Sequence, residues 1–519
     1  MQNQIQILWV DDEIEFLKSH ILFLESKGYA IKTVNSAIDA LEILQKQKFD
    51  IIFLDENMPG MTGLEMLDSL RNTLDETPVV MITKSEEERI MESALGNNIK
   101  DYLIKPVNPN QILMAIKKIT DHRKLRSAKT TTDYQTAFRE LGTEIYDCRT
   151  SSDWYGVYKK LIWWELALQD SGSPEDMQEI LLMQKTTANT EFAKFIKKNY
   201  ESWFAPKFDE RPIMSPSVLK HHVFPHLGDD KVMIIVIDNL RFDQWLAIKP
   251  AISKHYKVEK EEMYFSILPT ATQYARNSLF SGLMPEGIKR TYPDLWRDED
   301  DEGAKNEFEK DLFKNYLSRH GHKMPFYFEK ASNVKSARKV MENPARFIEH
   351  SLSVLVYNFV DILSHARTDV DVIKELASSE PAYRNLTRSW YEHSPLSKLI
   401  EYLSQNKVRL FITTDHGSIK INNPVKIIGD RDTTTNLRYK HGKNLNYKDG
   451  KVFEVSKPEA IGLPRLNVSG NFVFACENDF FAYPNNYNYY VNYYKDTFQH
   501  GGVSLEEMLI PIISLTPNK

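Results

Sequence analysis

The chain has 519 residues, and at roughly 150 residues per domain this length predicts about three domains. Hydrophobic residues make up 42% and charged residues 27%, as in ordinary globular proteins, and the formal net charge of −6 argues against a protein that coats DNA through its phosphates. The two cysteines, Cys148 and Cys476, lie far apart and exclude a disulfide framework or a cysteine-based zinc finger. Any metal site must therefore use histidine and carboxylate ligands.

The first residues, MQNQIQILWVDDE, place acidic side chains directly after the first apolar run, which is not the pattern of a signal peptide. No apolar run approaches the ~18 residues that a membrane span needs. We therefore expect a cytoplasmic protein with no membrane span.

Residues 1–120 alternate short apolar runs with amphipathic stretches such as 13–28 and 36–47. This alternation predicts an α/β domain with a doubly wound parallel sheet, in which ligands gather at the carboxyl ends of the strands. The expected strands are residues 5–10, 30–35, 50–56, 78–83 and 101–105.

Residues 121–225 show helical patterns and no strand-like run, which predicts a helical bundle that links two other domains. Asp153 and Pro174 are the expected helix starts. We interpret the aromatic side chains of this segment as core residues; they include Trp154, Trp163, Trp164 and Trp203.

Residues 226–519 return to strand–helix alternation and predict a large α/β domain. Its buried strand candidates are residues 231–239, 353–361, 408–417 and 509–515. The acidic segment 297–311 is expected to be a solvated face or loop. The aromatic segment 480–494 could stack on nucleic-acid bases, although a packed strand or loop is the commoner reason for such a composition.

Acidic residues end two of the N-terminal strands: Asp11 and Asp12 follow the first, and Asp55 ends the third. Thr83 ends the fourth strand and Lys105 the fifth. Parallel strands bring these ends to one edge, where three carboxylates repel each other unless a cation lies among them, and Mg²⁺ suits such an open oxygen site. One carboxylate could then accept a phosphoryl group as an acyl phosphate, held by the lysine and the threonine hydroxyl.

This set of residues resembles the receiver domain of two-component response regulators, which has a flavodoxin-like fold. The resemblance implies that Asp55 is the phosphoryl acceptor and that a sensor histidine kinase is the donor. It implies Mg²⁺ ligands at Asp11, Asp12, Asp55 and the backbone carbonyl of Asn57. It also implies switch roles for Thr83, Tyr102 and Lys105.

The C-terminal region contains a second set of metal-ligand residue types, four of them just after buried strand patterns. These residues are Asp238, Asp361, His365, Asp415, His416 and His500. Parallel strand ends would again bring them together, and carboxylate with imidazole ligands suit Zn²⁺ or Mn²⁺.

A nucleophile candidate lies in the segment 268–282, which offers Thr270 and Thr272. A threonine hydroxyl is a weak nucleophile at neutral pH, but coordination to a dication lowers its pKa enough to give an alkoxide. Two metals ~4 Å apart can stabilise both the attacking and the leaving oxygen of an in-line displacement at phosphorus.

The order of these residues resembles the alkaline phosphatase superfamily, and within it the PglZ branch. The resemblance implies two zinc ions, the first bound by Asp361, His365 and His500. The second would be bound by Asp238, Asp415, His416 and the alkoxide of Thr272. Thr272 is preferred over Thr270 because the family pattern Pro-Thr-x-Thr places the nucleophile at the second threonine.

Five further residues are substrate-contact candidates: Asn239, Arg276, Asn277, Arg438 and Lys440. The serine nucleophile of the phosphoglycerate mutases is not evident, and the arginine of classical alkaline phosphatases cannot be assigned. Both departures favour diesters over monoesters, because a diester transition state carries less charge and needs fewer cationic contacts.

The combination of a receiver (1–120), a helical linker (121–225) and a PglZ-like domain (226–519) resembles the response regulators tied to type IX secretion. It implies a zinc-dependent phosphodiesterase acting on nucleotide or oligonucleotide diesters, with phosphorylation at Asp55 controlling homodimerisation. The alternative is a catalytically silent, zinc-stabilised scaffold that binds a sigma factor or a secretion component. No helix-turn-helix pattern with a basic recognition helix is evident, which disfavours a classical transcription-factor output.

Overall fold

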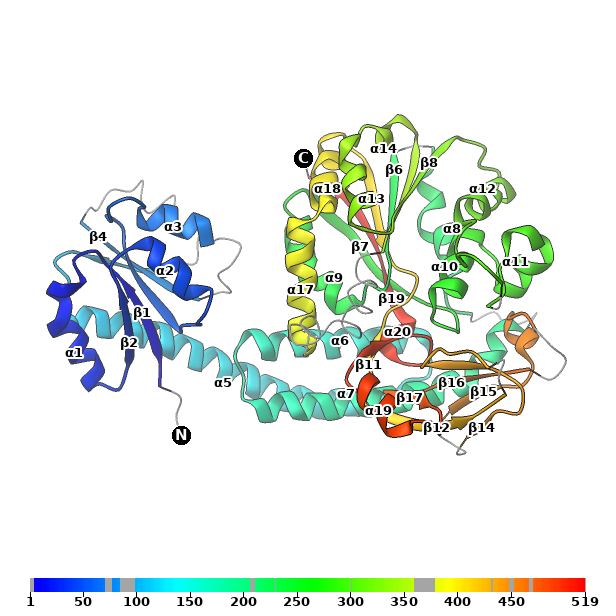
Figure 1. Cartoon of the computed structure of the whole chain (residues 1–519), viewed down its shortest axis with the longest axis horizontal. Helices are drawn as coiled ribbons and strands as arrows, with labels where there is room; N and C mark the ends of the chain where they lie inside the picture. The colour runs from blue at the N-terminus through cyan, green and yellow to red at the C-terminus, as the bar shows by residue number, and fades with distance from the viewer. Residues whose placement is uncertain are drawn as a thin grey trace. The chain divides into compact units, whose positions relative to one another are not determined.

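The computed structural model describes the chain in ten stretches, with the backbone alone at residues 121–126 and 334. These stretches are residues 4–70, 77–84, 99–205, 211–228, 230–299, 301–358, 379–430, 433–447, 452–465 and 470–518. The chain divides into two compact units (Figure 1). The first unit comprises residues 1–133 with 170–173, and the second comprises residues 134–169 with 174–519. Each is described by itself.

The first unit contains a five-stranded sheet of order β2-β1-β3-β4-β5, in which every pairing is parallel. The strands are β1 (Gln6–Val10), β2 (Ala30–Val34), β3 (Ile51–Asp55), β4 (Val79–Thr83) and β5 (Ile99–Ile104). This is the doubly wound order of flavodoxin-like proteins, so the predicted receiver fold is confirmed.

Alternating side chains of these strands supply two apolar layers because successive residues of a strand point to opposite faces. Leu8, Leu54 and Met81 pack on one face, whereas Trp9 and Phe53 pack on the other. The first face is covered by α2 (Ala37–Leu44) and α3 (Gly63–Leu70). The second is covered by η1 (Ile14–Leu17), α1 (Lys18–Ser26) and the start of α5 (Pro109–Asp147).

Helix α5 begins at Pro109, before the predicted start of the helical segment at residue 121, and continues across the boundary between the two units. No glycine or proline interrupts the sequence between Asn110 and Leu141, so nothing in that stretch ends the helix. It is followed by α6 (Ser151–Asp170), α7 (Glu175–Asn199) and η2 (Glu201–Phe204).

Helix α6 begins two residues before the predicted start at Asp153, because Thr150 and Asp153 cap its first turn reciprocally. The Asp153 carboxylate accepts from the backbone N–H of Thr150 at 2.8 Å, and the Asp153 N–H donates to the Thr150 hydroxyl at 3.3 Å. Hydrogen bonds to the Asp153 carboxylate from the backbone N–H groups of Arg149 and Thr150 lower the pKa of Asp153. Helix α7 starts directly after Pro174, close to the expected position.

The second unit contains a six-stranded sheet of order β7-β19-β10-β6-β9-β8. Strands β10, β6, β9 and β8 pair in parallel, and β19 pairs antiparallel with both β10 and β7. The strands are β6 (Val232–Ile237), β7 (Tyr256–Phe265), β8 (Phe326–Ala331), β9 (Leu352–Tyr357), β10 (Arg409–Thr413) and β19 (Leu509–Pro517). Because β10, β6 and β9 are neighbours, the residues that follow β6 and β10 meet at one edge.

Helices cover both faces of this sheet (Figure 1). Successive side chains of β6 point to opposite faces of the sheet. Ile235 belongs to the core that contains residues of α7, α9, α17 and α18, and Ile234 belongs to the core that contains residues of α8, α10 and α12. The elements of this part are α8 (Val218–His222), η3 (Phe224–His226), α9 (Phe242–Ile252), α10 (Thr272–Ser281), α11 (Pro285–Thr291), η4 (Pro293–Leu295), α12 (Glu309–Arg319), α13 (Val334–Glu342), α14 (Arg346–Glu349), α17 (Glu380–His393), α18 (Pro395–Gln405) and α20 (Leu505–Met508).

Short strands after β10 build a smaller β region. The ribbon β11 (Ile419–Lys420) with β18 (Phe498–Gln499) lies beside two three-stranded sheets and α19 (Tyr487–Tyr494). The sheets consist of β12 (Asn423–Ile428), β14 (Asn446–Tyr447) and β17 (Asp479–Ala482), and of β13 (Tyr439–Gly442), β15 (Val452–Val455) and β16 (Asn471–Ala475); η5 (Pro458–Ile461) connects the last two.

The linker helices share one core with the six-stranded sheet. Phe265 of β7 is fully buried, and its ring lies 6.1 Å from Phe192 of α7, 5.1 Å from Trp203 of η2 and 5.5 Å from Tyr155 of α6. Trp154 and Trp203 are core residues as predicted, but Trp163 is 58% exposed. The prediction for Trp163 was wrong because it lies on the helix face opposite Leu161 and Ile162.

We expect Phe265→Ala to lower the free energy of unfolding of the second unit by about 3–5 kcal/mol, the usual cost of removing a buried aromatic ring. The exposed Trp163→Ala is the matched control and should change it by less than about 0.5 kcal/mol. Denaturant unfolding of the full chain measures both. Equal effects of the two substitutions would show that Phe265 does not join the helices to the sheet.

Candidate functional sites

The first site is the acidic pocket at the carboxyl edge of the receiver sheet. Asp11 directly follows β1, and Asp55 is the last residue of β3; both are buried, whereas Asp12 is exposed. Each of the three carboxylates offers an oxygen within 4.8 Å of the others. The structure therefore brings together the predicted acidic residues.

Lys105 opposes the repulsion between these carboxylates. Its Nζ atom lies 2.9 Å from Asp55 Oδ2 and 3.0 Å from Asp11 Oδ2. Burial raises the pKa of Asp55, and the hydrogen bond from Lys105 lowers it. The negative charge of Asp11 raises it further, so that the pKa of Asp55 lies above its ordinary value. Although burial lowers the pKa of Lys105, the two carboxylates raise it overall, so the lysine stays charged.

Other receiver residues lie as the sequence predicted along the same edge. Thr83 ends β4 and is buried, Tyr102 is half-buried in β5, and Asn57 is exposed two residues after Asp55. Helix α3 begins at Gly63, where an added Cβ would lie 2.4 Å from the Asp55 carbonyl oxygen. Only glycine permits this close approach of the helix to the end of β3.

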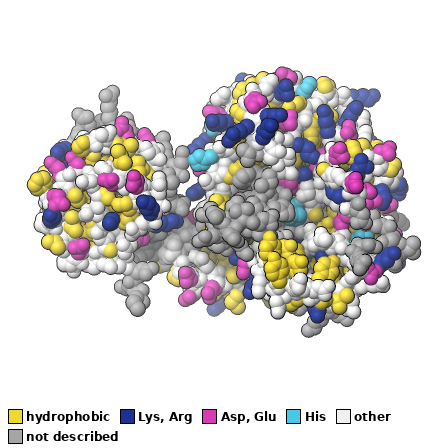
Figure 2. Space-filling model, in the orientation of Figure 1, with side chains coloured by type: hydrophobic (Ala, Val, Ile, Leu, Met, Phe, Trp, Pro, Cys, Tyr) yellow, Lys and Arg dark blue, Asp and Glu magenta, His cyan; other side chains and the backbone are white. Residues whose placement is uncertain are grey.

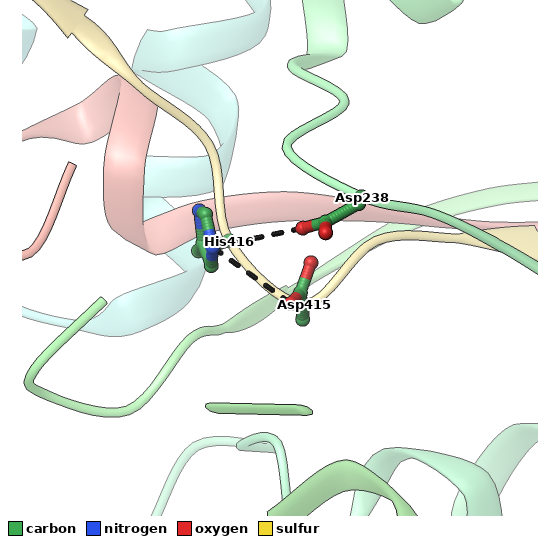
Figure 3. Close-up of side chains that lie close together, drawn as sticks. All are labelled: Asp238, Asp415 and His416. Carbon is green, nitrogen blue, oxygen red and sulfur yellow. Dashed lines mark ion pairs between the residues drawn. The ribbon is translucent and has the colours of Figure 1, made fainter. Parts of the chain in front are cut away.

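The second site lies at the carboxyl edge of the six-stranded sheet. Asp238 is the first residue after β6, and Asp415 and His416 follow β10, so all three side chains converge from neighbouring strands (Figure 3). The Nε2 atom of His416 is 3.8 Å from Asp238 Oδ1 and 3.7 Å from Asp415 Oδ2. All three side chains are buried, and their ligand atoms lie within 4.8 Å of one another.

Thr272 is the threonine that faces this cluster. It is the first residue of α10, and its Oγ1 atom lies 3.0 Å from His416 Nε2. Thr270, by contrast, is fully buried, and its hydroxyl donates to the Gly502 carbonyl and accepts from the Gly501 N–H, both at 3.0 Å. The side chain of Thr270 is therefore engaged in holding the backbone beside His500.

His500 and His416 lie together at the cluster. Their rings stack with centroids 4.2 Å apart and planes 21° from parallel, and His500 Nδ1 lies 3.1 Å from the Thr270 carbonyl oxygen. His416 Nδ1 lies 3.1 Å from the Gly417 carbonyl oxygen. A carbonyl accepts only, so Nδ1 donates to it, and Nε2 is the ring nitrogen that faces Thr272 and the two aspartates. Asp361 and His365, the remaining predicted ligands, lie outside the described residues.

Arg276, one turn along α10 from Thr272, neutralises the acidic cluster from behind. Its Nη1 atom is 2.6 Å from Asp238 Oδ2 and 3.8 Å from Asp415 Oδ2, and its Nε donates to Glu309 Oε1 at 2.7 Å. Glu309 also pairs with Lys330 at 2.8 Å. Burial by itself would lower the pKa of the Arg276 guanidinium. The negative charges of Asp238 and Glu309 outweigh this effect and keep the pKa above its ordinary value.

Sequence reasoning missed Glu309, because the segment 297–311 was expected to be solvated. Glu309 is fully buried at the start of α12, and Glu299 of the same segment accepts from the hydroxyls of Tyr274 and Tyr439 at 2.9 and 2.6 Å. The apolar spacing of Leu312, Phe313 and Tyr316 after Glu309 was the available indication of a buried helix face.

The other predicted substrate contacts are buried and hold protein partners. Arg438 makes two bonds to the Glu507 carboxylate, at 3.1 and 2.6 Å, and Asn277 Nδ2 donates to the carbonyls of Gln273 and Lys305. Lys440 donates to the Thr434 carbonyl at 2.8 Å, and burial lowers its pKa to about 7. Asn239 directly follows Asp238 and has a left-handed backbone, with φ of 63°. Contact of these residues with substrate stays a prediction.

None of the helices in the described part of the chain is both long enough and apolar enough to cross a membrane.

Comparison with protein-family models finds three matches in chain order. A response regulator receiver domain matches residues 7–117, and a PorX response regulator linker domain matches residues 124–204. A BREX system PglZ alkaline phosphatase-like domain matches residues 218–515.

Individual relatives match over shorter stretches. The alginate biosynthesis transcriptional regulatory protein AlgB of Pseudomonas syringae pv. tomato is 36% identical over 124 residues, which are 24% of this chain and 28% of AlgB. The transcriptional regulatory protein ResD of Bacillus subtilis is 30% identical over 117 residues, which are 22% of this chain and 48% of ResD. The chain thus spans less than half the length of either relative.

Among solved structures, the chemotaxis response regulator CheY4 of Vibrio cholerae is 29% identical; the match covers 22% of this chain and 99% of CheY4, with a TM-score of 0.22. The PglZ match by itself spans more than half of the 519 residues, and the receiver and linker matches precede it in order. The chain therefore belongs to the PorX-like response regulators and carries an alkaline phosphatase-like domain of the PglZ family.

Proposed function

We propose that the protein is a response regulator whose output domain is a zinc-dependent phosphodiesterase acting on nucleotide or oligonucleotide diesters. The observation that carries this proposal is the hydroxyl of Thr272, 3.0 Å from His416 Nε2 in a cluster with Asp238 and Asp415. A hydroxyl beside convergent carboxylate and imidazole groups is the arrangement that phosphoryl transfer through a threonine nucleophile requires.

The residues of the cluster fit a zinc ion. Asp238, Asp415 and His416 offer two carboxylate oxygens and one imidazole nitrogen within 4.8 Å of one another, a donor set that suits Zn²⁺ or Mn²⁺. When bound, such a dication lowers the pKa of a coordinated hydroxyl and stabilises charge on phosphoryl oxygens. A second zinc, which the family resemblance assigns to His500 with Asp361 and His365, is part of the same proposal.

The residues of α10 orient the reacting groups. Thr272 at the first position of α10 lies where unpaired backbone N–H groups and the helix dipole favour an anionic phosphoryl group. The Thr272 hydroxyl loses its proton and its oxygen attacks phosphorus; the bond to one ester oxygen breaks, and that oxygen takes up a proton and leaves as an alcohol. Water then attacks the phosphorus on the threonine, which releases a phosphate monoester and restores the Thr272 hydroxyl. Arg276 fixes the Asp238 carboxylate and offsets the charge of three buried acids during these steps.

The receiver pocket supplies the regulatory half of the proposal. Asp11, Asp12 and Asp55 provide the hard oxygen ligands that Mg²⁺ prefers. In the described part of the chain, Asp55 Oδ1 is buried and accepts no hydrogen bond. This supports the proposal that Asp55 takes a phosphoryl group from a histidine kinase on that oxygen. Lys105 and Thr83 would then hold the phosphoryl oxygens, and we propose that the altered receiver face promotes homodimerisation. A role in type IX secretion is part of the proposal through the resemblance to response regulators tied to that pathway, and the match to a PorX response regulator linker domain supports the resemblance.

The first prediction concerns Thr272. We expect Thr272→Ala to reduce hydrolysis of bis-p-nitrophenyl phosphate by the zinc-loaded protein at least about 10³-fold, because the nucleophile is removed. Thr272→Ser is the matched control and should retain measurable turnover, since it keeps the hydroxyl. Zinc content is measured for each protein by atomic absorption. A zinc-bound wild type without hydrolysis would instead support the silent scaffold that binds a sigma factor or a secretion component.

The second prediction concerns Asp55. With Mg²⁺ and beryllofluoride, a phosphoryl mimic, the mass of the wild type measured by light scattering should double, whereas that of Asp55→Asn should stay constant. Asp68→Asn, the same change at an exposed position of α3, should behave like the wild type. A wild-type mass that does not respond to the mimic would contradict control of dimerisation by phosphorylation.

A further inference from the structure

The aromatic segment 480–494 was expected to be a packed strand or loop. Its first residues belong to strand β17, but its second half is the helix α19. Tyr487, Val491 and Tyr494, spaced as one helix face, pack on a small core formed by Ile419, Ile421, Phe480 and Ala482. This inward face accounts for the folding of the helix. It does not account for the tyrosines that point elsewhere.

The opposite side of α19 presents tyrosine rings to solvent. Tyr489 is 64% exposed and Tyr490 is 40% exposed, and Tyr493 is half-buried beside them. The rings of Tyr489 and Tyr493 lie within 14° of parallel with centroids 6.1 Å apart. Figure 2 shows a hydrophobic patch on this part of the second unit. Such a gathering of exposed rings marks a binding surface more often than isolated apolar residues do.

A two-stranded ribbon connects this helix to the candidate zinc cluster. Strand β18 directly precedes His500, and its partner β11 begins three residues after His416, with Ile419 opposite Gln499 and Lys420 opposite Phe498. Tyr494 and His500 are six positions apart, so the chain between them spans at most about 20 Å. An extended substrate of a few nucleotides is long enough to reach from the cluster to the rings.

The charge around the rings suits an anionic chain. Residues 484–495 contain no acidic side chain, four asparagines and Lys495, in a protein of net charge −6. The adjacent Asp496 lies 3.7 Å from Lys420 of the ribbon. Asparagine amides can donate to and accept from base edges, and tyrosine faces stack on any base.

We propose that Tyr489, Tyr490 and Tyr493 form a stacking platform that binds the bases of a single-stranded oligonucleotide whose phosphodiester lies at Thr272. This proposal rests on the phosphodiesterase function proposed above and adds the residues that hold the bases of an oligonucleotide substrate. Base stacking on such rings is tolerant of sequence, so the platform selects for length and unpaired bases.

Binding is tested with 5′-fluorescein-labelled pentathymidylate by fluorescence anisotropy, on full-length protein in a Thr272→Ala background that prevents cleavage. Tyr489→Ala with Tyr490→Ala should weaken binding about tenfold or more, since each ring stacks on a base. Tyr489→Phe with Tyr490→Phe should bind like the parent because the ring faces remain. Tyr146→Ala, a 58% exposed tyrosine of α5, is the matched control and should have no effect.

Hydrolysis by proteins that keep Thr272 separates this proposal from the proposed function. The double alanine variant should leave hydrolysis of bis-p-nitrophenyl phosphate unchanged and raise only the KM for the oligonucleotide. Unaltered oligonucleotide affinity in the double alanine variant overturns the platform. The platform is also overturned if the mass of the double alanine variant, measured by light scattering, differs from that of the parent. Such a difference would assign the rings to a contact between copies of the chain. Stacking-dependent binding without any wild-type hydrolysis would retain the platform and refute the phosphodiesterase.

Discussion

Carboxylates gathered at the carboxyl edge of a parallel sheet repel each other, and both units of this protein depend on cationic side chains that offset this repulsion. In the receiver, Lys105 contacts Asp11 and Asp55. In the second unit, Arg276 contacts Asp238 and Glu309. The topology that concentrates the acids is the same in each case, since adjacent parallel strands deliver the residues that follow them to one edge. The chemistry differs because the receiver edge offers oxygen ligands, whereas the second edge adds the imidazole of His416 and the hydroxyl of Thr272.

The linker helices are joined to the second site by charge as well as by the aromatic core around Phe265. Arg384 of α17 pairs with Asp243 at 3.1 Å and also contacts Glu165 of α6, and Lys185 of α7 lies 2.7 Å from Glu165. Although burial favours the neutral acid, Lys185 and Arg384 lower the pKa of Glu165 to about 2. Asp243 is five residues beyond Asp238, so this buried network fixes the linker against the segment that carries a candidate zinc ligand. Replacing one charged residue of this network by a neutral one would leave a buried charge without its partner. The loss of folding free energy would be far larger than that from removing a surface ion pair.

Sequence reasoning was most successful where function depends on residues at strand ends. Asp11, Asp55 and Thr83, and likewise Asp238, Asp415 and His416, could be placed on two sheet edges because buried strands are short, apolar and easily recognised. It failed for Glu309 and Trp163, whose burial and exposure depend on which helix face meets a neighbour. It also could not decide the role of Arg438, which pairs with Glu507 from 69 residues away. A long-range ion pair leaves no local pattern in the sequence.

The sequence by itself determined the receiver sheet, the strands β6, β9, β10 and β19 of the second sheet and the helical character of the linker, because hydrophobic periodicity and turn chemistry act over a few neighbouring residues. It did not predict β7 and β8, the other two strands of the second sheet. Only the tertiary structure decided which charged groups neutralise one another and that Thr272, which the family pattern favoured, is the threonine beside His416. The Arg276–Glu309 contact joins residues 33 positions apart, and the Thr272–His416 contact joins residues 144 apart. The division of α19 into a packed face and an exposed row of rings was likewise decided by what lies beneath it, the core of Ile419, Ile421, Phe480 and Ala482. Contacts at such separations follow from the packing of whole elements, which no local pattern encodes.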